Sequence, residues 1–405
     1  MARAAARWHA GHQLTLLEGT REFFPALIAA MDAARERIHF ETYIFDFTGS
    51  GADVAEALLR AAQRGVQTCV AVDGLGTGTA PRAWMQRLAE AGVLWRVYSP
   101  VNALALLLPT RWRRLHRKLC VVDGSVAFCG GINVLDDFHD PGWGRLDAPR
   151  LDFAVRVTGP LVADAQHAVA LLWRRLQAVH DLRRRDLQQA VQDLVKDDRG
   201  AAAPHASAAR QDGASARAAL LLRDNLRHRK HIERAYLKAI GEARHDVLIA
   251  NAYFIPGRRL RNALVRAAQR GVRVQLLLQG RYEYFMQYHA SRPVYGLLLQ
   301  AGVEIYEYAP SFLHAKVAVI DGHWATVGSS NLDPLSLLLA REANVVIEDR
   351  AFAAQLRVRL LRAMHEEGQR MESAHHGRRP WPQRCKEYAA MLVMRLGLLL
   401  TGHRY

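Results

Sequence analysis

Two stretches of the chain carry the same pattern of residues that could do chemistry. Each reads His-x-Lys, four residues, Asp, six residues, Gly-(Gly or Ser)-x-Asn. The first copy consists of His116, Lys118, Asp123, Gly130, Gly131 and Asn133, and the second of His314, Lys316, Asp321, Gly328, Ser329 and Asn331. Because the functional residue types recur at one spacing in both copies, we expect the two stretches to form one site.

These residue types suit the transfer of a phosphoryl group. One imidazole can attack phosphorus while the other protonates the leaving alcohol, and lysine ammonium groups with asparagine amides stabilise the developing negative charge. Other enzymes use two cations for that purpose. The residues therefore predict phosphodiester chemistry without a metal ion or other cofactor. A single His-x-Lys would fit a solvated strand edge equally well, and the duplication argues against that reading.

The paired pattern resembles the HKD motifs of the phospholipase D superfamily. Within the superfamily, the chain is similar to the shorter bacterial cardiolipin synthases, which lack N-terminal membrane helices. The matching stretches are residues 40–45, 73–76, 116–118, 222–225, 251–256 and 328–334, and with the helices around them the resemblance covers residues 14–361. It implies an α/β fold of two fused lobes, each a mixed β-sheet flanked by helices, related by a pseudo-two-fold and sharing one active site.

The resemblance also implies roles for individual residues. It favours His116 as the nucleophile that becomes phosphorylated and His314 as the general acid. Each histidine needs a carboxylate that orients it and supports its charge. The candidates are Asp152 and Glu342, each at the start of the strand that follows a motif. The implied catalytic set is His116, Lys118, Asp123, His314, Lys316 and Asp321, and the implied substrate-binding residues are Asn133, Ser329 and Asn331.

Two aspartates of this set have a structural explanation as well. Asp123 and Asp321 are each followed by glycine, which is typical of a tight hairpin turn, so we assign them a structural role first. The two copies also differ at one position, because Gly131 stands where Ser329 stands in the second copy. Only the second copy can offer a serine hydroxyl, which is compatible with unequal roles for the two histidines.

The implied reaction is phosphatidyl transfer. A phosphatidyl group passes from phosphatidylglycerol to histidine with release of glycerol, and a second lipid alcohol takes it to form cardiolipin. Two other activities of the superfamily remain open: a phospholipase D-type hydrolase of phospholipids, and a nuclease or phosphodiesterase. A non-catalytic membrane-binding module would have no need for paired His, Lys and Asn. Because one histidine must be neutral and the other charged, we expect a bell-shaped pH dependence.

The composition indicates an anionic partner. The formal net charge is +16 and the sequence pI is near 10.2, which suits acidic lipid or nucleic acid. Aromatic residues make up only 8% of the chain, whereas nucleic-acid binding calls for stacking platforms. We therefore expect an anionic phospholipid membrane with phosphatidylglycerol and cardiolipin as partner, and no nucleic acid. The four cysteines have neither disulfide nor metal spacing, and the oligomeric state stays open.

Predicted helices and strands alternate through the chain, and the alternation occurs twice. The hexapeptide at residues 61–66 recurs letter for letter at 267–272. A repeat of about 200 residues is too long for a solenoid and predicts two fused lobes. The expected division is an N-terminal lobe at 1–195, a flexible linker at 196–217, a C-terminal lobe at 218–370 and a basic and apolar tail at 371–405.

Two apolar stretches are candidates for contact with a membrane. Residues 101–108 are followed closely by the basic run 111–114, and residues 388–400 lie beside Arg384 and Lys386. A core helix or buried strand is the alternative for each. No run reaches the roughly 18 apolar residues of a membrane span, and residues 1–20 lack the apolar core of a signal peptide. We therefore expect a peripheral protein on the cytoplasmic face of the bacterial inner membrane.

Overall fold

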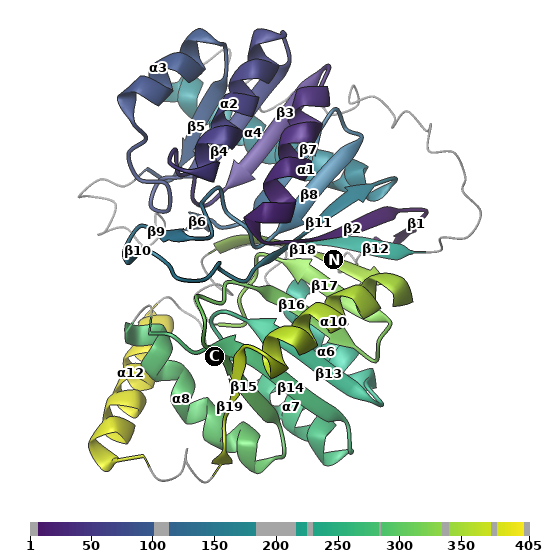
Figure 1. Cartoon of the computed structure of the whole chain (residues 1–405), viewed down its shortest axis with the longest axis vertical. Helices are drawn as coiled ribbons and strands as arrows, with labels where there is room; N and C mark the ends of the chain where they lie inside the picture. Colours follow the sequence, from purple (N-terminus) through teal and green to yellow (C-terminus); the bar gives the residue numbers. More distant parts are fainter. Residues whose placement is uncertain are drawn as a thin grey trace.

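The computed structural model shows two lobes stacked on one another, the upper built mainly from the N-terminal half of the chain and the lower from the C-terminal half (Figure 1). The structure describes residues 7–100, 113–183, 216–224, 230–282, 285–333, 340–373 and 379–400. The apolar stretch 101–108 and most of the expected linker 196–217 lie outside them. Within the described part of the chain, no helix is both long enough and apolar enough to cross a membrane.

The first lobe is a mixed seven-stranded sheet flanked by helices. Its strands, in spatial order, are β2 (Gln13–Glu18), β11 (Phe153–Thr158), β8 (Val126–Gly130), β7 (Lys118–Val122), β3 (Arg37–Thr42), β4 (Gln67–Asp73) and β5 (Leu94–Tyr98). Its helices are α1 (Gly19–Ala33), α2 (Ser50–Gln63), α3 (Arg82–Glu90) and α4 (Leu161–Arg183). β3, β4 and β5 run parallel, and α2 and α3 supply the crossovers that parallel strands require.

The second lobe repeats this order strand for strand. Its sheet runs β1 (His9–Ala10), β12 (Arg217–Arg223), β18 (Ala340–Glu348), β17 (Trp324–Gly328), β16 (Lys316–Ile320), β13 (Asp246–Asn251), β14 (Arg273–Gln279), β15 (Glu304–Tyr308) and β19 (Gly368–Arg370). Its helices include α6 (His231–Glu242), α7 (Arg258–Gln269), α8 (Phe285–Gln300), α10 (Arg350–His365) and α12 (Trp381–Leu400). The seven strands from β12 to β15 match those from β2 to β5, which confirms the two-lobed mixed α/β fold.

The repeated hexapeptide has the same structural role in both lobes. It ends α2 in the first lobe and α7 in the second, and each helix is followed by a glycine with φ near +86°, at Gly65 and Gly271. A residue with a side chain disfavours this left-handed conformation, so glycine is required there. The next residue starts the turn into the parallel strand β4 or β14.

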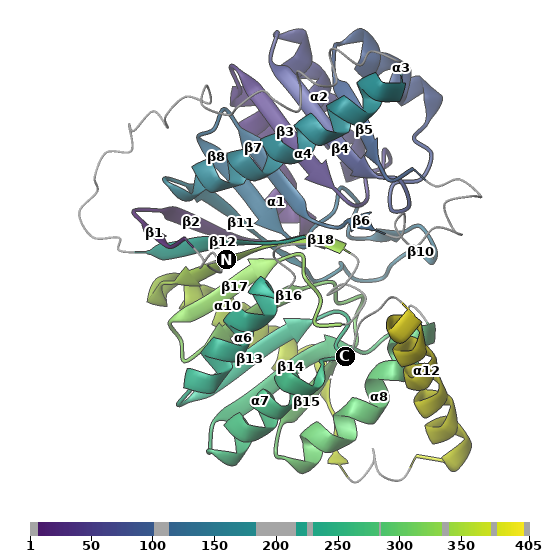
Figure 2. The same cartoon turned by 180° about the vertical axis from the view of Figure 1, so that it is seen from behind.

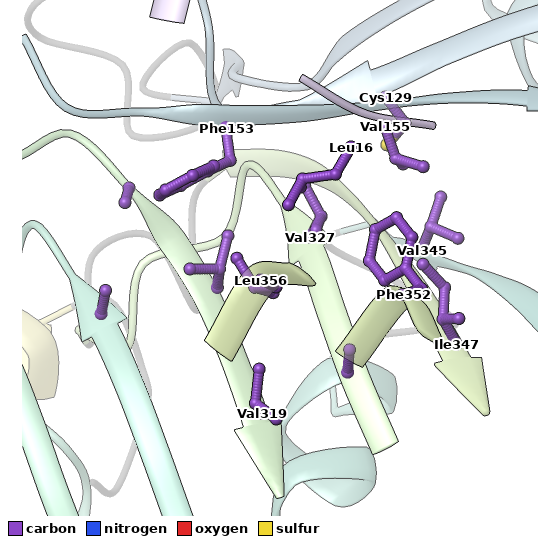
Figure 3. Close-up of a cluster of buried hydrophobic side chains, with 14 of the residues drawn as sticks. Leu16, Cys129, Phe153, Val155, Val319, Val327, Val345, Ile347, Phe352 and Leu356 are labelled. Atoms are coloured by element: carbon purple, nitrogen blue, oxygen red, sulfur yellow. The ribbon is translucent and has the colours of Figure 1, made fainter. Parts of the chain in front are cut away.

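The two sheets face each other across one hydrophobic core (Figure 3). Leu16, Cys129, Phe153 and Val155 come from the first lobe, and Val327, Val345, Ile347, Phe352 and Leu356 come from the second. Each fully buried large apolar side chain contributes about 1.5 to 3 kcal/mol. Reciprocal helix contacts complete the interface, because α4 touches β12 and α10 touches β2. The lobes therefore form one body rather than two independent domains.

Four segments depart from the expected division into lobes, linker and tail. β1 pairs antiparallel with β12, so residues 9–10 extend the second lobe's sheet by capping an edge strand that would otherwise expose its backbone donors and acceptors. β6 (Arg114–Leu115) pairs parallel with β18. The expected tail contains α12, which lies along α8 in both views (Figures 1 and 2). β12 begins at Arg217, the last residue assigned to the linker.

Candidate active site

Both motif histidines lie where the lobes meet. His116 and His314 stand two residues before β7 and β16 begin, and their side chains are 15% and 16% exposed. The His116 N–H donates to the Arg341 carbonyl of the second lobe (3.1 Å), and the His314 N–H donates to the Leu151 carbonyl of the first (2.8 Å). These two reciprocal backbone bonds dock each histidine on the opposite lobe.

The docking places each histidine against a carboxylate of the opposite lobe. Arg341 precedes Glu342 and Leu151 precedes Asp152, so the backbone bonds set each acid beside its histidine. His116 Nδ1 lies 3.0 Å from Glu342 Oε1, and His314 Nδ1 lies 2.6 Å from Asp152 Oδ2. With Nδ1 engaged, Nε2 is the nitrogen of each ring that can react. We name the two arrangements the His116 half-site and the His314 half-site.

The two motif lysines are buried between the half-sites. Lys118 Nζ donates to the His116 carbonyl (2.8 Å) and Lys316 Nζ donates to the His314 carbonyl. Burial, with a further contribution from the charge of Lys316, lowers the pKa of Lys118 to about 7. An anionic phosphodiester placed here would favour the charged ammonium and raise that pKa again. The pair is therefore suited to hold the phosphate oxygens and their developing charge.

The electrostatics of the two half-sites differ. In the His116 half-site, burial lowers the pKa of His116. Burial also acts to raise the pKa of Glu342, but His116, Lys118 and the Ser329 hydroxyl outweigh it, and that pKa is lowered overall. In the His314 half-site, burial and then the charge of Lys316 lower the pKa of His314 well below its usual value. Burial raises the pKa of Asp152 to about 7, so Glu342 is ionised at neutral pH while Asp152 titrates there.

Ser329 is placed to support Glu342 rather than to bind substrate. Its Oγ donates to Glu342 Oε2 (2.5 Å) and accepts from the Ala343 N–H (3.1 Å), and the side chain is fully buried. Gly131, its counterpart, lies against Asp152, and a Cβ there would collide with both carboxylate oxygens. The difference between Ser329 and Gly131 therefore matches the difference between the carboxylates beside them, Glu342 and Asp152.

The two asparagines of the motif are buried. Asn133 Oδ1 accepts from the Ile44 N–H (3.1 Å), so it ties the motif to the start of the loop after β3. Asn331 is 1% exposed. Substrate binding by Asn133 and Asn331 stays a prediction, whereas the contacts of Ser329 favour a positioning role.

The contacts of the motif aspartates support the structural role assigned to them first, whereas their place in the catalytic set stays a prediction. Asp123 stands five positions beyond Lys118 at the far end of the strand, about 16 Å of chain away. The Asp123 carboxylate accepts from the backbone N–H groups of Arg35, Glu36 and Arg37 at 2.8 to 2.9 Å. The Asp321 carboxylate accepts likewise from Arg244, His245 and Asp246 at 2.8 to 3.0 Å. Both aspartates have φ of 49° and precede glycines with positive φ, which confirms the expected tight turns.

Sequence reasoning missed two residues that position the histidines. Asp73 Oδ2 accepts from the Leu115 N–H (2.7 Å), and Gln279 Oε1 accepts from the Leu313 N–H (3.1 Å). Leu115 and Leu313 directly precede the two histidines, and Asp73 and Gln279 end the equivalent strands β4 and β14. Their place at matching strand ends was the available signal, but the residue types differ. The Tyr43 ring, 4.9 Å from the His116 ring, was also missed.

The described residues contain no cluster of three or more His, Cys, Asp or Glu side chains arranged to hold a metal ion. Two lobes with reciprocal His–carboxylate pairs and two buried lysines at their junction define a phospholipase D-like phosphoryl-transfer enzyme. A family model described as "Cardiolipin synthase, PLD-like domain" matches residues 27–137 and 236–364.

Related proteins agree with this class. The chain is 37% identical to "Cardiolipin synthase B" of Escherichia coli, over 98% of this chain and 91% of that protein. It is 29% identical to "Cardiolipin synthase" of Oceanobacillus iheyensis, over 80% of this chain and 63% of that protein. The crystal structure of phosphatidylserine synthase from Haemophilus influenzae shares the fold, with a TM-score of 0.67 at 14% identity, covering 95% and 94% of the two chains. The chain belongs to the phospholipase D-like cardiolipin synthase family.

Proposed function

We propose that this protein is a phosphatidyltransferase that makes cardiolipin from phosphatidylglycerol through a phosphohistidine intermediate and releases glycerol. The observation that carries the proposal is the pair of half-sites, each with a histidine fixed by a carboxylate of the opposite lobe. Membership of the cardiolipin synthase family supports the choice of lipid. Two partly exposed imidazoles beside two buried lysines provide a nucleophile, a proton carrier and charge stabilisation in one place.

The first step transfers the phosphatidyl group to the protein. Nε2 of His116 attacks the phosphorus of phosphatidylglycerol, and the bond between phosphorus and the oxygen of the headgroup glycerol breaks. His314 gives its proton to that oxygen, so neutral glycerol leaves. Ionised Glu342 stabilises the positive charge that His116 acquires, which is the part that the carboxylate plays in a catalytic triad.

The second step transfers the phosphatidyl group to the acceptor lipid and regenerates free His116. His314, now neutral, takes the proton from a headgroup hydroxyl of a second phosphatidylglycerol, and the oxygen attacks the phosphohistidine. The bond between phosphorus and Nε2 breaks, cardiolipin leaves and His116 is restored. The bound phosphodiester offsets the lysine charges that lower the pKa of His314, which allows His314 to carry a proton in the first step.

We also propose that the enzyme works as a peripheral protein on an anionic bilayer containing phosphatidylglycerol and cardiolipin, at the cytoplasmic face of the inner membrane. The net charge of +16 supports an acidic lipid surface. Three of the four cysteines are buried free thiols and the fourth is exposed and unpaired, which suits a reducing compartment.

The experiment that tests the function is incubation of the purified protein with phosphatidylglycerol vesicles in the presence of a chelator. Mass spectrometry follows cardiolipin, phosphatidic acid and glycerol. Cardiolipin with equimolar glycerol is the expected result. Phosphatidic acid alone would replace the transferase by a phospholipase D-type hydrolase, and no turnover would contradict phosphatidylglycerol as the donor.

A further inference from the structure

The helices α8 and α12 form a pair on the outer side of the second lobe (Figures 1 and 2). Ala390 and Met394 of α12 pack with Ala290 of α8 and with Ile255. The Ile255 N–H donates to the Leu332 carbonyl (3.0 Å), and Leu332 directly follows the motif residue Asn331. The helix pair is therefore joined to the segment that carries the second motif.

The outward side of α12 is apolar. Trp381, Tyr388, Leu392 and Val393 are between 52% and 74% exposed, and we call them the α12 stripe. Tyr388 and Leu392 follow Trp381 by seven and eleven residues. At 3.6 residues per turn, these three side chains lie on one face of the helix. A surface helix of a water-soluble protein normally turns its apolar residues to the core and its polar residues outward. α12 buries one apolar face against α8 and presents a second one outward.

The charges beside the α12 stripe are positive. Arg384 and Lys386 are exposed, and on a helical projection they fall on its two sides. Glu387, the one carboxylate in residues 379–394, is buried and accepts a hydrogen bond from Arg379 (2.5 Å). An apolar strip with cations on both sides is the pattern of helices that lie in the interface of an anionic bilayer.

Further apolar side chains are exposed on loops and at the start of α8. They are Leu75, Phe138, Trp143, Tyr282 and Phe285, and we call them the apolar rim. Leu75 lies two residues beyond Asp73, which holds the residue before His116. The Trp143 ring is 6.2 Å from that of Phe312, two residues before His314. Tyr282 follows the end of β14 and leads into α8.

We propose that the α12 stripe and the apolar rim together form the surface that rests on an anionic phospholipid bilayer, with α12 lying along the interface and the histidines turned toward the headgroups. Aromatic side chains such as Trp381 and Tyr388 sit at headgroup depth, and the flanking cations meet the phosphates. The inference rests on the proposed function and deepens it, because it names the side from which phosphatidylglycerol reaches the site.

Cys385 lies within the outward side of α12 and is the exposed cysteine, while Cys69, Cys120 and Cys129 are buried. A polarity-sensitive fluorophore on Cys385 of the otherwise unchanged protein therefore reports on this surface. Vesicles that contain phosphatidylglycerol should shift its emission to the blue, and vesicles of phosphatidylcholine alone should shift it far less. The matched control is the fluorophore at Val358→Cys in a Cys385→Ser background, because Val358 is 66% exposed on α10.

Three results would overturn the proposal. The first is an emission of the Cys385 probe that does not change with phosphatidylglycerol vesicles, and the second is an equal change at the Val358 control. The third is an emission shift that depends on protein concentration without vesicles, because a second copy of this chain would then be the occupant. None of these readings depends on turnover. A protein that docks but makes no cardiolipin would contradict the proposed function alone.

A second experiment removes the apolar contact. The variant Leu392→Ser with Val393→Ser should bind phosphatidylglycerol vesicles at least about tenfold more weakly, with turnover of vesicle lipid falling in parallel. Turnover of monomeric dihexanoyl phosphatidylglycerol should stay at the wild-type rate, which also shows that the variant is folded. Val358→Ser is the control and should change neither reading. Unchanged vesicle binding by the double variant would contradict the proposed surface.

Discussion

The two half-sites have the same backbone and different side chains. In the His116 half-site a glutamate reaches the imidazole and a serine hydroxyl holds the glutamate. In the His314 half-site a shorter aspartate reaches it, and glycine stands where the serine would be. The repeat therefore places a histidine beside a carboxylate of the opposite lobe twice, and the side chains behind the two histidines differ. The first arrangement favours a histidine that becomes positive, whereas in the second the carboxylate Asp152 itself titrates near neutral pH.

Loss of either histidine is expected to have the largest effect. His116→Ala and His314→Ala should each lower cardiolipin synthesis by about 10³-fold or more. A p-nitrophenyl phosphodiester separates their roles, because p-nitrophenolate leaves without needing a proton. His314→Ala should release a burst of one p-nitrophenolate per protein molecule, whereas His116→Ala should release none. Binding to phosphatidylglycerol vesicles is the control and should survive in both, and a burst from His116→Ala would reverse the assignment.

Loss of the supporting carboxylates should distinguish the half-sites by pH. Glu342→Gln should cost about 10²- to 10³-fold in kcat, with little change between about pH 5 and 9, because the pKa of Glu342 is lowered and the group stays ionised. Burial raises the pKa of Asp152 to about 7, so Asp152 is mostly protonated below that pH. Asp152→Asn should therefore cost little at low pH and more as pH rises through 7.

The measurement for both variants is the pH profile of kcat/KM beside that of the wild type, which should be bell-shaped. If the half-sites were equivalent, the loss of kcat/KM would depend on pH in the same way in Glu342→Gln and in Asp152→Asn. That outcome would remove the electrostatic basis for assigning the nucleophile to His116.

Adding a side chain at Gly131 should lower kcat more than removing the hydroxyl of Ser329, its counterpart in the other half-site. Gly131→Ser adds a Cβ that collides with the Asp152 carboxylate, so Asp152 must move from His314. Overpacking of this kind costs about 1 to 3 kcal/mol, and we expect roughly 100-fold lower kcat. A chemical-denaturation midpoint measured in parallel separates displacement of Asp152 from global unfolding, and wild-type kcat would contradict the positioning argument.

Emptying the space at Ser329 should have a smaller effect. Ser329→Ala removes one hydrogen bond to an ionised carboxylate, worth about 1.5 kcal/mol or more, so kcat should fall about tenfold. The pKa of Glu342 should rise without this donor, and the acidic limb of the pH profile should move to higher pH. Ser330→Ala is the matched control, because the Ser330 hydroxyl is equally buried but donates to the Asn331 carbonyl (3.4 Å). Equal effects of the two variants would argue against a specific role for Ser329.

The repeated motif predicted a duplicated, two-lobed fold, and the family resemblance implied that His116 and His314 share one site. Which carboxylate serves which histidine could not be predicted. Spacing along the chain relates Asp152 to His116, whereas reciprocal backbone bonds between the lobes set Asp152 beside His314 instead. The positioning roles of Asp73 and Gln279 could not be predicted from the repeat either, because the equivalent positions make the same hydrogen bond with different residue types.

The smallest effect on activity is expected from the motif aspartates, and the turn geometry explains why. Asp123→Asn and Asp321→Asn keep a residue that tolerates the positive φ but lose the charge that three backbone N–H groups share. Each should lower the free energy of unfolding by about 1 kcal/mol and leave kcat unchanged. Backbone donors outweigh burial and lower the pKa of Asp321. Its contribution is therefore present above the unfolded-state pKa and is lost as pH falls through the lower folded-state value. Urea unfolding at neutral and strongly acidic pH measures this, and a fall in kcat without a fall in stability would support their place in the catalytic set.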